Sequence, residues 1–302
     1  MAQATPESGA GHRPGTPSLS IIIVTHNSAE SLPGLIDSLH AYPPGCPWEL
    51  IVVDNASRDR SIALLHDGIP DAVVIVSPQN RGFAAAVNTG ARAARGECLL
   101  LANPDVTWCD NAIDRLKDLL GKHPRAAAVA PRLLYPDGRP QPSIRRFPTH
   151  ANIWFSRRSP WGPAAAVRRS PWSYTLTDPP SPSVIEAVAA TFLCVRTSAF
   201  REVGGMDEGY FLYVEDTDLC RRWHDAGWEV WSDPAVTVRH VWQSRVMPDP
   251  MLARHHRDGI RRYFRRHHPK KRLRNAAVFT ALALAAGWDR LARSSPGRAG
   301  GS

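Results

Sequence analysis

Residues 99–108 read LLLANPDVTW, an apolar run that turns polar at Asn103-Pro104-Asp105 and then becomes apolar again. The run predicts a buried strand. Pro104 fixes its own φ and restrains Asn103, so the strand should end in a sharp corner that holds one carboxylate, Asp105. Taken alone, the triplet is more typical of a plain turn, and the neighbouring strands decide whether it is something more.

Three earlier segments repeat this design of a β-branched apolar run that closes on polar residues. LSIIIVT (19–25) precedes HNS, ELIVVD (49–54) precedes NAS, and DAVVIVS (71–77) precedes PQNRG. Segments with helical features alternate with these strands, which predicts right-handed crossovers and a parallel sheet with aligned carboxyl ends. Ligands of such sheets bind at those ends. We therefore expect one polar rim formed by Thr25, Asn27, Asp54, Asn55, Asn80, Arg81, Asn103 and Asp105.

The rim is suited to a nucleotide, although two common phosphate-binding loops are excluded. The sequence has no G-x-G-x-x-G after the first strand and no G-x-x-x-x-G-K-[ST] anywhere. Asp54 is suited to accepting hydrogen bonds from a base or ribose, and Arg81 to pairing with phosphate. Beside three other polar corners, Asp105 is better explained as a ligand of a hydrated divalent cation than as a turn residue.

The second half of the chain has a different character. Residues 136–184 are rich in Pro, Arg and Trp and predict a long loop or insertion, which contains RRSPW twice, at 157–161 and 168–172. VIEAVAATFLCVRTSAF then resumes the strand pattern and ends in a short helix. TDLCRRWHDAGW predicts a helix closed by Gly227, and WEVWSDPAVTVRH predicts the last strands.

Glu215-Asp216-x-Asp218 is a second group of carboxylates, at the start of that helix. Adjacent helical residues face different directions, so we expect one of Glu215 and Asp216 to enter the site. The other would cap the helix or pair with Arg221 or Arg222. Acids are also favoured at a helix N-terminus by the helix dipole, which leaves a structural explanation open. His240 closes the strand VTVRH, and its spacing alone favours a core histidine over a metal ligand.

Composition limits the remaining possibilities. The five cysteines are odd in number and never spaced as C-x-x-C, which argues against a disulfide framework or a zinc site and favours a reducing cytoplasm. Residues 1–17 predict a disordered N-terminus without the apolar segment of a signal peptide or anchor. The net charge of +9 is concentrated at residues 254–274, which hold ten Arg or Lys and one acid.

This basic stretch leads into AAVFTALALAAGW, which is shorter than the roughly 20 residues that span a bilayer. We expect residues 246–302 to form a basic, amphipathic tail that contacts an anionic membrane surface. The alternative is a terminal helix that packs this apolar run on the core. Trp161 and Trp172 of the RRSPW motifs are expected to stack on an acceptor sugar, unless these motifs belong to a disordered basic loop.

In order, IIIVTHN, VVDNAS, QNRGFAAAVNTG, LLLANPD, VGGMDEGYFLYVEDTDLCRR and His240 resemble family 2 glycosyltransferases of the GT-A fold, and closely their rhamnosyltransferase branch. The resemblance covers residues 18–245. It implies an α/β GT-A fold for nucleotide-diphospho-sugar transfer, with a mostly parallel central sheet flanked by helices. The nucleotide-binding half would span about residues 18–131 and the acceptor-side half about residues 132–245.

The resemblance also implies roles for individual residues. Asp216 matches the catalytic base, Asp105 and His240 match positions that bind Mg²⁺ or Mn²⁺, and Glu215 lies on the acceptor side. Asn103 stands where a full D-x-D motif has its first Asp, so the site has fewer charged ligands. VAATFLCVR replaces a Gly-rich stretch, which implies a different acceptor pocket. The implied nucleotide-sugar pocket comprises Thr25, Asn27, Asp54, Asn55, Asn80, Arg81, Gly82, Asn88 and Asn103.

The expected activity is an inverting transfer of L-rhamnose from dTDP-L-rhamnose to a glycan or polyprenyl-diphosphate-linked sugar, in cell-envelope polysaccharide synthesis at the inner face of the plasma membrane. One alternative keeps the fold with a UDP-sugar donor. Another is nucleic-acid binding through the basic tail, although no recognised motif supports it and the carboxylate-rich rim would repel a polyanion. A third is a sugar nucleotidyltransferase, although the first strand lacks the Gly-rich loop with basic residues that such chemistry uses.

Overall fold

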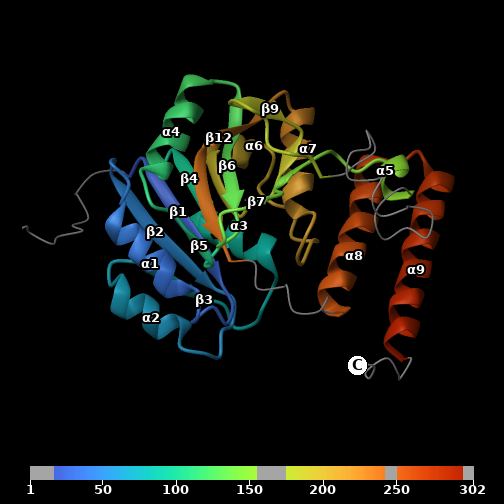
Figure 1. Cartoon of the computed structure of the whole chain (residues 1–302), viewed down its shortest axis with the longest axis horizontal. Helices are drawn as coiled ribbons and strands as arrows, with labels where there is room; N and C mark the ends of the chain where they lie inside the picture. Colours follow the sequence, from blue (N-terminus) through green and yellow to red (C-terminus); the bar gives the residue numbers. More distant parts are fainter. Residues whose placement is uncertain (1–16, 155–174, 242–249, 295–302) are drawn as a thin grey trace, which may run out of the picture.

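The computed structural model describes residues 17–154, 175–241 and 250–294, with side chains as far as residue 284. A large twisted sheet carries helices on both faces, and two C-terminal helices stand beside one end of it (Figure 1). The expectation of a disordered N-terminus falls almost wholly outside the described residues.

The four strands predicted from the polar corners form the parallel half of the sheet. They lie in the order β3-β2-β1-β4, and each neighbouring pair is parallel. The register pairs Thr25 with Asp54, so the polar corners of the first two strands meet at one edge as predicted. The four strands are β1 (Leu19–Thr25), β2 (Trp48–Asp54), β3 (Val73–Val76) and β4 (Cys98–Ala102).

The sheet continues beyond β4 with antiparallel joins. β11 (Phe192–Arg196) runs antiparallel to both β4 and β6 (Ala126–Leu134), and β12 (Glu229–His240) lies parallel to β6. Two short strands pair with β12, namely β5 (Val106–Thr107) and β9 (Ser183–Ile185). The predicted last strands are one strand, β12, with two register shifts.

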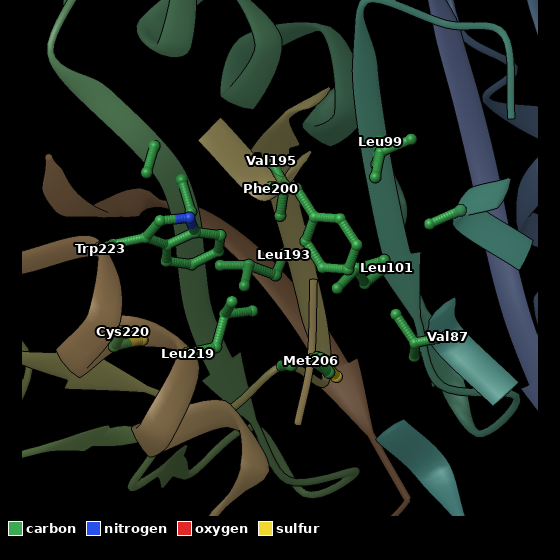
Figure 2. Close-up of a cluster of buried hydrophobic side chains, with 14 of the residues drawn as sticks. Val87, Leu99, Leu101, Leu193, Val195, Phe200, Met206, Leu219, Cys220 and Trp223 are labelled. Atoms are coloured by element: carbon green, nitrogen blue, oxygen red, sulfur yellow. The ribbon is translucent and has the colours of Figure 1, made fainter. Parts of the chain in front are cut away.

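Both faces of the sheet are buried, which explains the continuous apolar runs of its strands. Side chains alternate along each strand, so Ile22 lies in one core cluster and Ile23 in the other. The cluster in Figure 2 packs the sheet against α3 (Phe83–Ala93), α6 (Thr197–Glu202) and α7 (Glu215–Asp225). The opposite cluster includes α1 (Leu32–Ala41), α2 (Ser61–Gly68) and α4 (Ala112–Lys122).

The prediction of a long loop over residues 136–184 is wrong for the part that the structure describes. β7 (Pro140–Gln141) pairs with β6, and β8 (Ile144–Arg145) pairs with β10 (Ala187–Val188). α5 (His150–Trp154) follows. Strands of two residues have too little periodicity to be recognised, and their partners lie far away in sequence. The two RRSPW motifs, with Trp161 and Trp172, lie outside the described residues.

The C-terminal segment forms two helices, α8 (Pro250–His267) and α9 (Arg272–Ser294). Ile260, Tyr263 and Phe264 of α8 are fully buried in a third cluster with Tyr210 and Val214, and Val278 of α9 joins them. The predicted boundary at residue 245 therefore separates α8 from residues that it contacts closely. Within the described residues, each helix is too short or too polar to cross a bilayer.

Candidate active site

Hydrogen bonds join the ends of β1 and β2. Thr25 Oγ1 donates to Asp54 Oδ1 at 3.0 Å, and the Ser57 amide donates to Asp54 Oδ2 at 2.9 Å. Thr25 and Asp54 are fully buried. Asn27 is exposed, has a φ of 52°, and accepts a hydrogen bond from the Arg58 amide. The first two polar corners thus form one wall, from which the Asn27 side chain is accessible.

Asn55 holds residues 80–82 against this wall. Its side-chain amide donates to the Gly82 carbonyl at 3.1 Å, and its Oδ1 accepts from the Arg81 amide at 3.0 Å. Asn80 Oδ1 accepts from the Gly82 amide at 2.9 Å. Asn55 and Asn80 therefore bind backbone groups in this structure, and their contact with a nucleotide stays a prediction.

Glu208 connects two further residues of the predicted nucleotide pocket. Its carboxylate pairs with Arg81 at 2.8 Å and accepts from Asn88 Nδ2 at 3.1 Å. Asn88 also exchanges hydrogen bonds of 2.8 and 2.9 Å with the Met206 backbone and is only 8% exposed. Asn88 therefore anchors residues 206–208 in this structure, and its contact with a nucleotide stays a prediction. Arg81 is half exposed and remains accessible.

The Asn-Pro-Asp corner lies between β4 and β5 and faces the end of β12. Asp105 Oδ1 is 3.2 Å from His240 Nε2, and the Asp105 carbonyl accepts from the Val241 amide at 2.9 Å. Gln141 Oε1 lies 2.8 Å from His240 Nδ1 and completes the cluster. The backbone N–H of Asn103 donates to the Thr191 carbonyl at 2.8 Å and so fixes this corner. The structure thus brings together the two predicted metal ligands, 135 positions apart in sequence.

These residues fit a divalent cation shared with a diphosphate. Gln141 Oε1 contacts His240 Nδ1, which leaves Nε2 facing the Asp105 carboxylate, so a nitrogen and a carboxylate oxygen suited to a divalent cation lie side by side. Across the residues that the structure describes, no cluster of three or more His, Cys, Asp or Glu is suited to a metal. The remaining ligands would be phosphate oxygens and water, as Mg²⁺ commonly prefers.

Asp216 lies in the first turn of α7 and is paired with Arg145 of β8. Arg145 Nη1 is 3.1 and 3.0 Å from the two carboxylate oxygens, and the Thr217 amide donates to Oδ1 at 2.6 Å. Asp216 is 8% exposed, so its carboxylate is nearly buried. Since Gln141 and Arg145 are four residues apart, their Cα atoms lie within about 14 Å, which places the two clusters near each other.

Glu215 has a different environment from its neighbour. It is 4% exposed, and its Oε2 is buried without a hydrogen-bond partner. Burial, reinforced by the negative charge of Asp216, raises the pKa of Glu215 to about 8. Burial therefore favours the protonated form of Glu215, which can donate a hydrogen bond.

The alternative in which one of these two acids pairs with Arg221 or Arg222 is wrong. Arg221 pairs with Asp225 at 2.9 Å and Arg222 with Asp218 at 2.8 Å, because residues four apart on a helix are neighbours. The actual partner of Asp216, Arg145, comes from the segment predicted to be a loop.

Sequence reasoning missed both Arg145 and Gln141. The arginine pair at 145–146 was a signal of available charge, but nothing local indicated where it would point. Gln141 follows Pro140 in a polar stretch and carried no signal at all.

Solved structures with a similar fold include proteins bound to a nucleotide or a nucleotide sugar. The mannosyltransferase PcManGT from Pyrobaculum calidifontis, solved with GDP-Man and Mn²⁺, matches with a TM-score of 0.56 and 17% identity, over 94% of this chain and 78% of that one. TarS of S. aureus with UDP matches with a TM-score of 0.54 and 16% identity, over 82% of this chain and 72% of that one. The fold is therefore the GT-A fold of glycosyltransferases.

Sequence comparisons define the family. The profile described as Glycosyl transferase family 2 matches residues 20–175. An N-acetylglucosaminyl-diphospho-decaprenol L-rhamnosyltransferase of Mycobacterium tuberculosis is 32% identical over 79% of this chain and 81% of its own length. Rhamnosyltransferase WbbL of Escherichia coli K12 is 28% identical over 73% of this chain and 82% of its own. The chain belongs to glycosyltransferase family 2 and is a glycosyltransferase.

Proposed function

We propose that this enzyme transfers L-rhamnose from dTDP-L-rhamnose to a hydroxyl of a polyprenyl-diphosphate-linked sugar, with inversion at the anomeric carbon. The observation that carries the chemistry is Asp216, a carboxylate that Arg145 orients in the first turn of α7. The donor and acceptor are argued from the relatives, two of which are named as rhamnosyltransferases and one of which acts on a decaprenol-linked sugar.

In this mechanism Asp216 accepts the proton of the acceptor hydroxyl as its oxygen attacks the anomeric carbon. The bond from that carbon to the nucleoside diphosphate breaks on the opposite face, so no covalent enzyme intermediate forms. Arg145 holds both Asp216 oxygens and so orients the carboxylate toward the incoming hydroxyl. For a β-L-rhamnosyl donor, inversion gives an α-L-rhamnoside.

Asp105 and His240 would hold Mg²⁺ or Mn²⁺, with Gln141 orienting the imidazole. When bound, the cation would stabilise negative charge on the departing diphosphate. Arg81 is accessible at the same rim and would contribute a second positive charge once it exchanges Glu208 for phosphate.

Calorimetric titration with dTDP and UDP, each with and without Mg²⁺ or Mn²⁺, tests the donor. Metal-dependent binding of dTDP in preference to UDP is expected. A preference for UDP would leave the transferase but replace its donor. Asp105→Asn should remove the metal dependence of binding, because it removes the carboxylate of a two-residue site.

Asp216→Asn tests the base. Turnover should fall by about 100-fold to 10,000-fold, since general base catalysis contributes on that scale. Binding of dTDP should stay within about twofold of wild type, because Asp216 lies on the acceptor side. Substantial residual turnover would remove Asp216 from the base role.

We also propose that the turn between α8 and α9 contacts an anionic cytoplasmic leaflet, where a lipid-linked acceptor would be found. Lys270, Lys271, Arg272 and Arg274 are exposed there, and Leu273 between them is 89% exposed. Each basic residue near such a surface contributes about 1 kcal/mol of attraction, and an exposed leucine adds apolar contact.

A further inference from the structure

The backbone immediately before the proposed catalytic base is strained. Tyr213 and Val214 have φ values of 70° and 74°, in the left-handed region that side chains avoid. For a β-branched residue such as Val214 this conformation is a true outlier, and each strained residue costs about 1–3 kcal/mol. Val214 is the N-terminal cap residue of α7, so this turn determines the direction in which Glu215 and Asp216 project.

Helix α8 lies directly against this turn. A Cβ atom on Gly259 would be 2.8 Å from the Tyr213 carbonyl oxygen, closer than real Cβ atoms approach another atom, and 3.1 Å from Val214 Cγ2, which is a tight contact. Val214 is 2% exposed and packs in the same cluster as Ile260 and Phe264 of α8. Because residue 259 is a glycine, α8 can pack closely against the strained turn.

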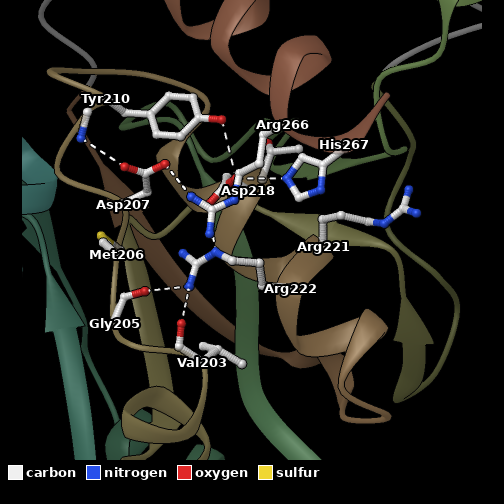
Figure 3. Close-up of polar contacts among 12 residues, drawn as sticks. Val203, Gly205, Met206, Asp207, Tyr210, Asp218, Arg221, Arg222, Arg266 and His267 are labelled. Carbon is white, nitrogen blue, oxygen red and sulfur yellow. Dashed lines mark hydrogen bonds and ion pairs between the residues drawn. The ribbon is translucent and has the colours of Figure 1, made fainter. Parts of the chain in front are cut away.

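Polar contacts also join α8 to Asp218 of α7, which lies two residues after Asp216. Asp218 is fully buried, and its carboxylate accepts from His267 Nε2 at 2.8 Å, Arg222 Nε at 2.8 Å and Tyr210 Oη at 3.3 Å (Figure 3). Burial alone would raise the pKa of Asp218, but the hydrogen bond from His267 and the charge of Arg222 outweigh it and lower the pKa. Asp218 is thus a stable anion that ties α7 to α8.

The other end of this network reaches the donor side. Arg222 Nη1 donates to the carbonyls of Val203 and Gly205, at 2.7 and 2.6 Å. Asp207 pairs with Arg262 and Arg266 of α8, at 2.6 and 2.5 Å. The next residue, Glu208, pairs with Arg81. Residues 203–214 are therefore held between the nucleotide rim and α8.

We infer that α8 is a clamp that positions the catalytic base: Gly259 and His267 hold the Tyr213–Val214 turn and the first turn of α7 in the geometry that presents Asp216. These are positioning residues, which act on the acceptor hydroxyl only through Asp216. The inference rests on the proposed role of Asp216 as base. It makes the C-terminal helix part of the catalytic unit and not an appended tail.

Gly259→Ala tests the clamp, with Gly121→Ala as the matched control. Both glycines lie within helices, so alanine should favour each helix equally, but a Cβ at 121 meets no atom within 4 Å. In Gly259→Ala, kcat should fall by about tenfold to 100-fold, because a small misplacement of a catalytic group has effects of that size. Binding of dTDP should stay within about twofold, and Gly121→Ala should match wild type in both.

Hydrogen exchange at α7 separates this inference from the assignment of the base. The Asp218 amide bonds to the Val214 carbonyl at 2.8 Å, across the strained turn. Its exchange should speed up in Gly259→Ala and not in Gly121→Ala, whether or not Asp216 is the base. His267→Gln, which retains a donor for Asp218, should keep more kcat than His267→Ala.

Unchanged kcat and unchanged exchange in Gly259→Ala would overturn the clamp. Loss of dTDP binding in parallel with kcat would also overturn it, because that result would mean general unfolding. If exchange speeds up while Asp216→Asn retains turnover, the clamp stands and the base assignment fails.

Discussion

Glu215 and Asp216 are adjacent in sequence and have opposite environments. Asp216 faces a guanidinium from β8, whereas Glu215 points a carboxyl oxygen into a site without a partner. The raised pKa of Glu215 follows from that burial first and from the charge of Asp216 second. The contribution of Glu215 to the free energy of unfolding should therefore depend on pH.

The sign of this dependence follows from proton binding. Between pH 4.5 and about 8 the folded chain keeps the Glu215 proton that the unfolded chain releases, so stability should fall as pH rises across this window. Glu215→Gln cannot ionise, so it should not lose this stability. The melting temperature of the variant minus that of wild type should therefore grow as pH rises from 4.5 to about 8. Glu97→Gln, at an exposed site, is the control. A difference in melting temperature between Glu215→Gln and wild type that does not change with pH would contradict the raised pKa of Glu215.

Gly82 is a second residue on which the site depends. Its φ of 87° and ψ of 172° are accessible essentially to glycine alone, and a Cβ would overlap the Phe211 carbonyl oxygen. Gly82→Ala should destabilise the protein by more than the roughly 1–3 kcal/mol of backbone strain, measured by urea denaturation. Gly204→Ala separates the two effects, since Gly204 has a φ of 79° and no atom within 4 Å of a Cβ. Equal losses in both variants would mean that the contact with Phe211 has no cost.

At the scale of elements, α7 connects the core to the site. Its first turn carries Asp216 and Asp218, while Leu219, Cys220 and Trp223 pack beneath the sheet. Trp223 is fully buried, and its indole N–H donates to the Ala199 carbonyl of α6 at 3.0 Å. The acids of α7 are therefore held in place both by packing of the helix on the core and by its contacts with α8.

Trp223→Ala should cost about 3–5 kcal/mol of unfolding free energy, because it leaves a large cavity and an unpaired carbonyl in the core. Trp228→Ala is the control, since Trp228 is only partly buried at the end of the same segment. Chemical denaturation measures both. A similar loss at the two positions would mean that burial at 223 does not anchor α7.

At the scale of the whole molecule, the basic charge divides into two groups. Arg262 and Arg266 are exposed but pair with Asp207, which is nearly buried, whereas the cations around Leu273 are exposed at the α8–α9 turn. Deleting the chain from Arg254 would remove Tyr263 and Phe264 from the third core cluster. Such a deletion cannot distinguish membrane contact from folding, and point substitutions at the α8–α9 turn are the better test.

Lys270→Glu with Lys271→Glu should weaken binding to vesicles that contain anionic phosphatidylglycerol, by about tenfold or more if each cation contributes near 1 kcal/mol. Binding should also weaken with salt. Arg60→Glu with Lys122→Glu changes the net charge equally at exposed positions elsewhere and should bind as wild type does. Co-sedimentation measures both. Equal losses in the two double variants would indicate net charge, not a defined surface.

Much of the fold could be predicted from local patterns. The four apolar runs that close on polar corners became β1 to β4 in one parallel order, and the family motifs led to the GT-A fold. Asp105 and His240, chosen from different arguments, lie 3.2 Å apart. The short strands β7 and β8 could not be predicted, because their pairing partners and not their own residues stabilise them.

Local patterns in the chain are enough to predict the alternation of strands and helices, the polar rim and the carboxylates, since periodicity and strand ends are local properties. The contact of Arg145 with Asp216, the contact of Gln141 with His240 and the packing of α8 on the turn at Val214 depend on how distant segments fold together. Each of these contacts joins residues that are at least 40 positions apart in sequence. Such contacts exist only when the sheet order and the docking of α8 bring them together, and no local pattern encodes that.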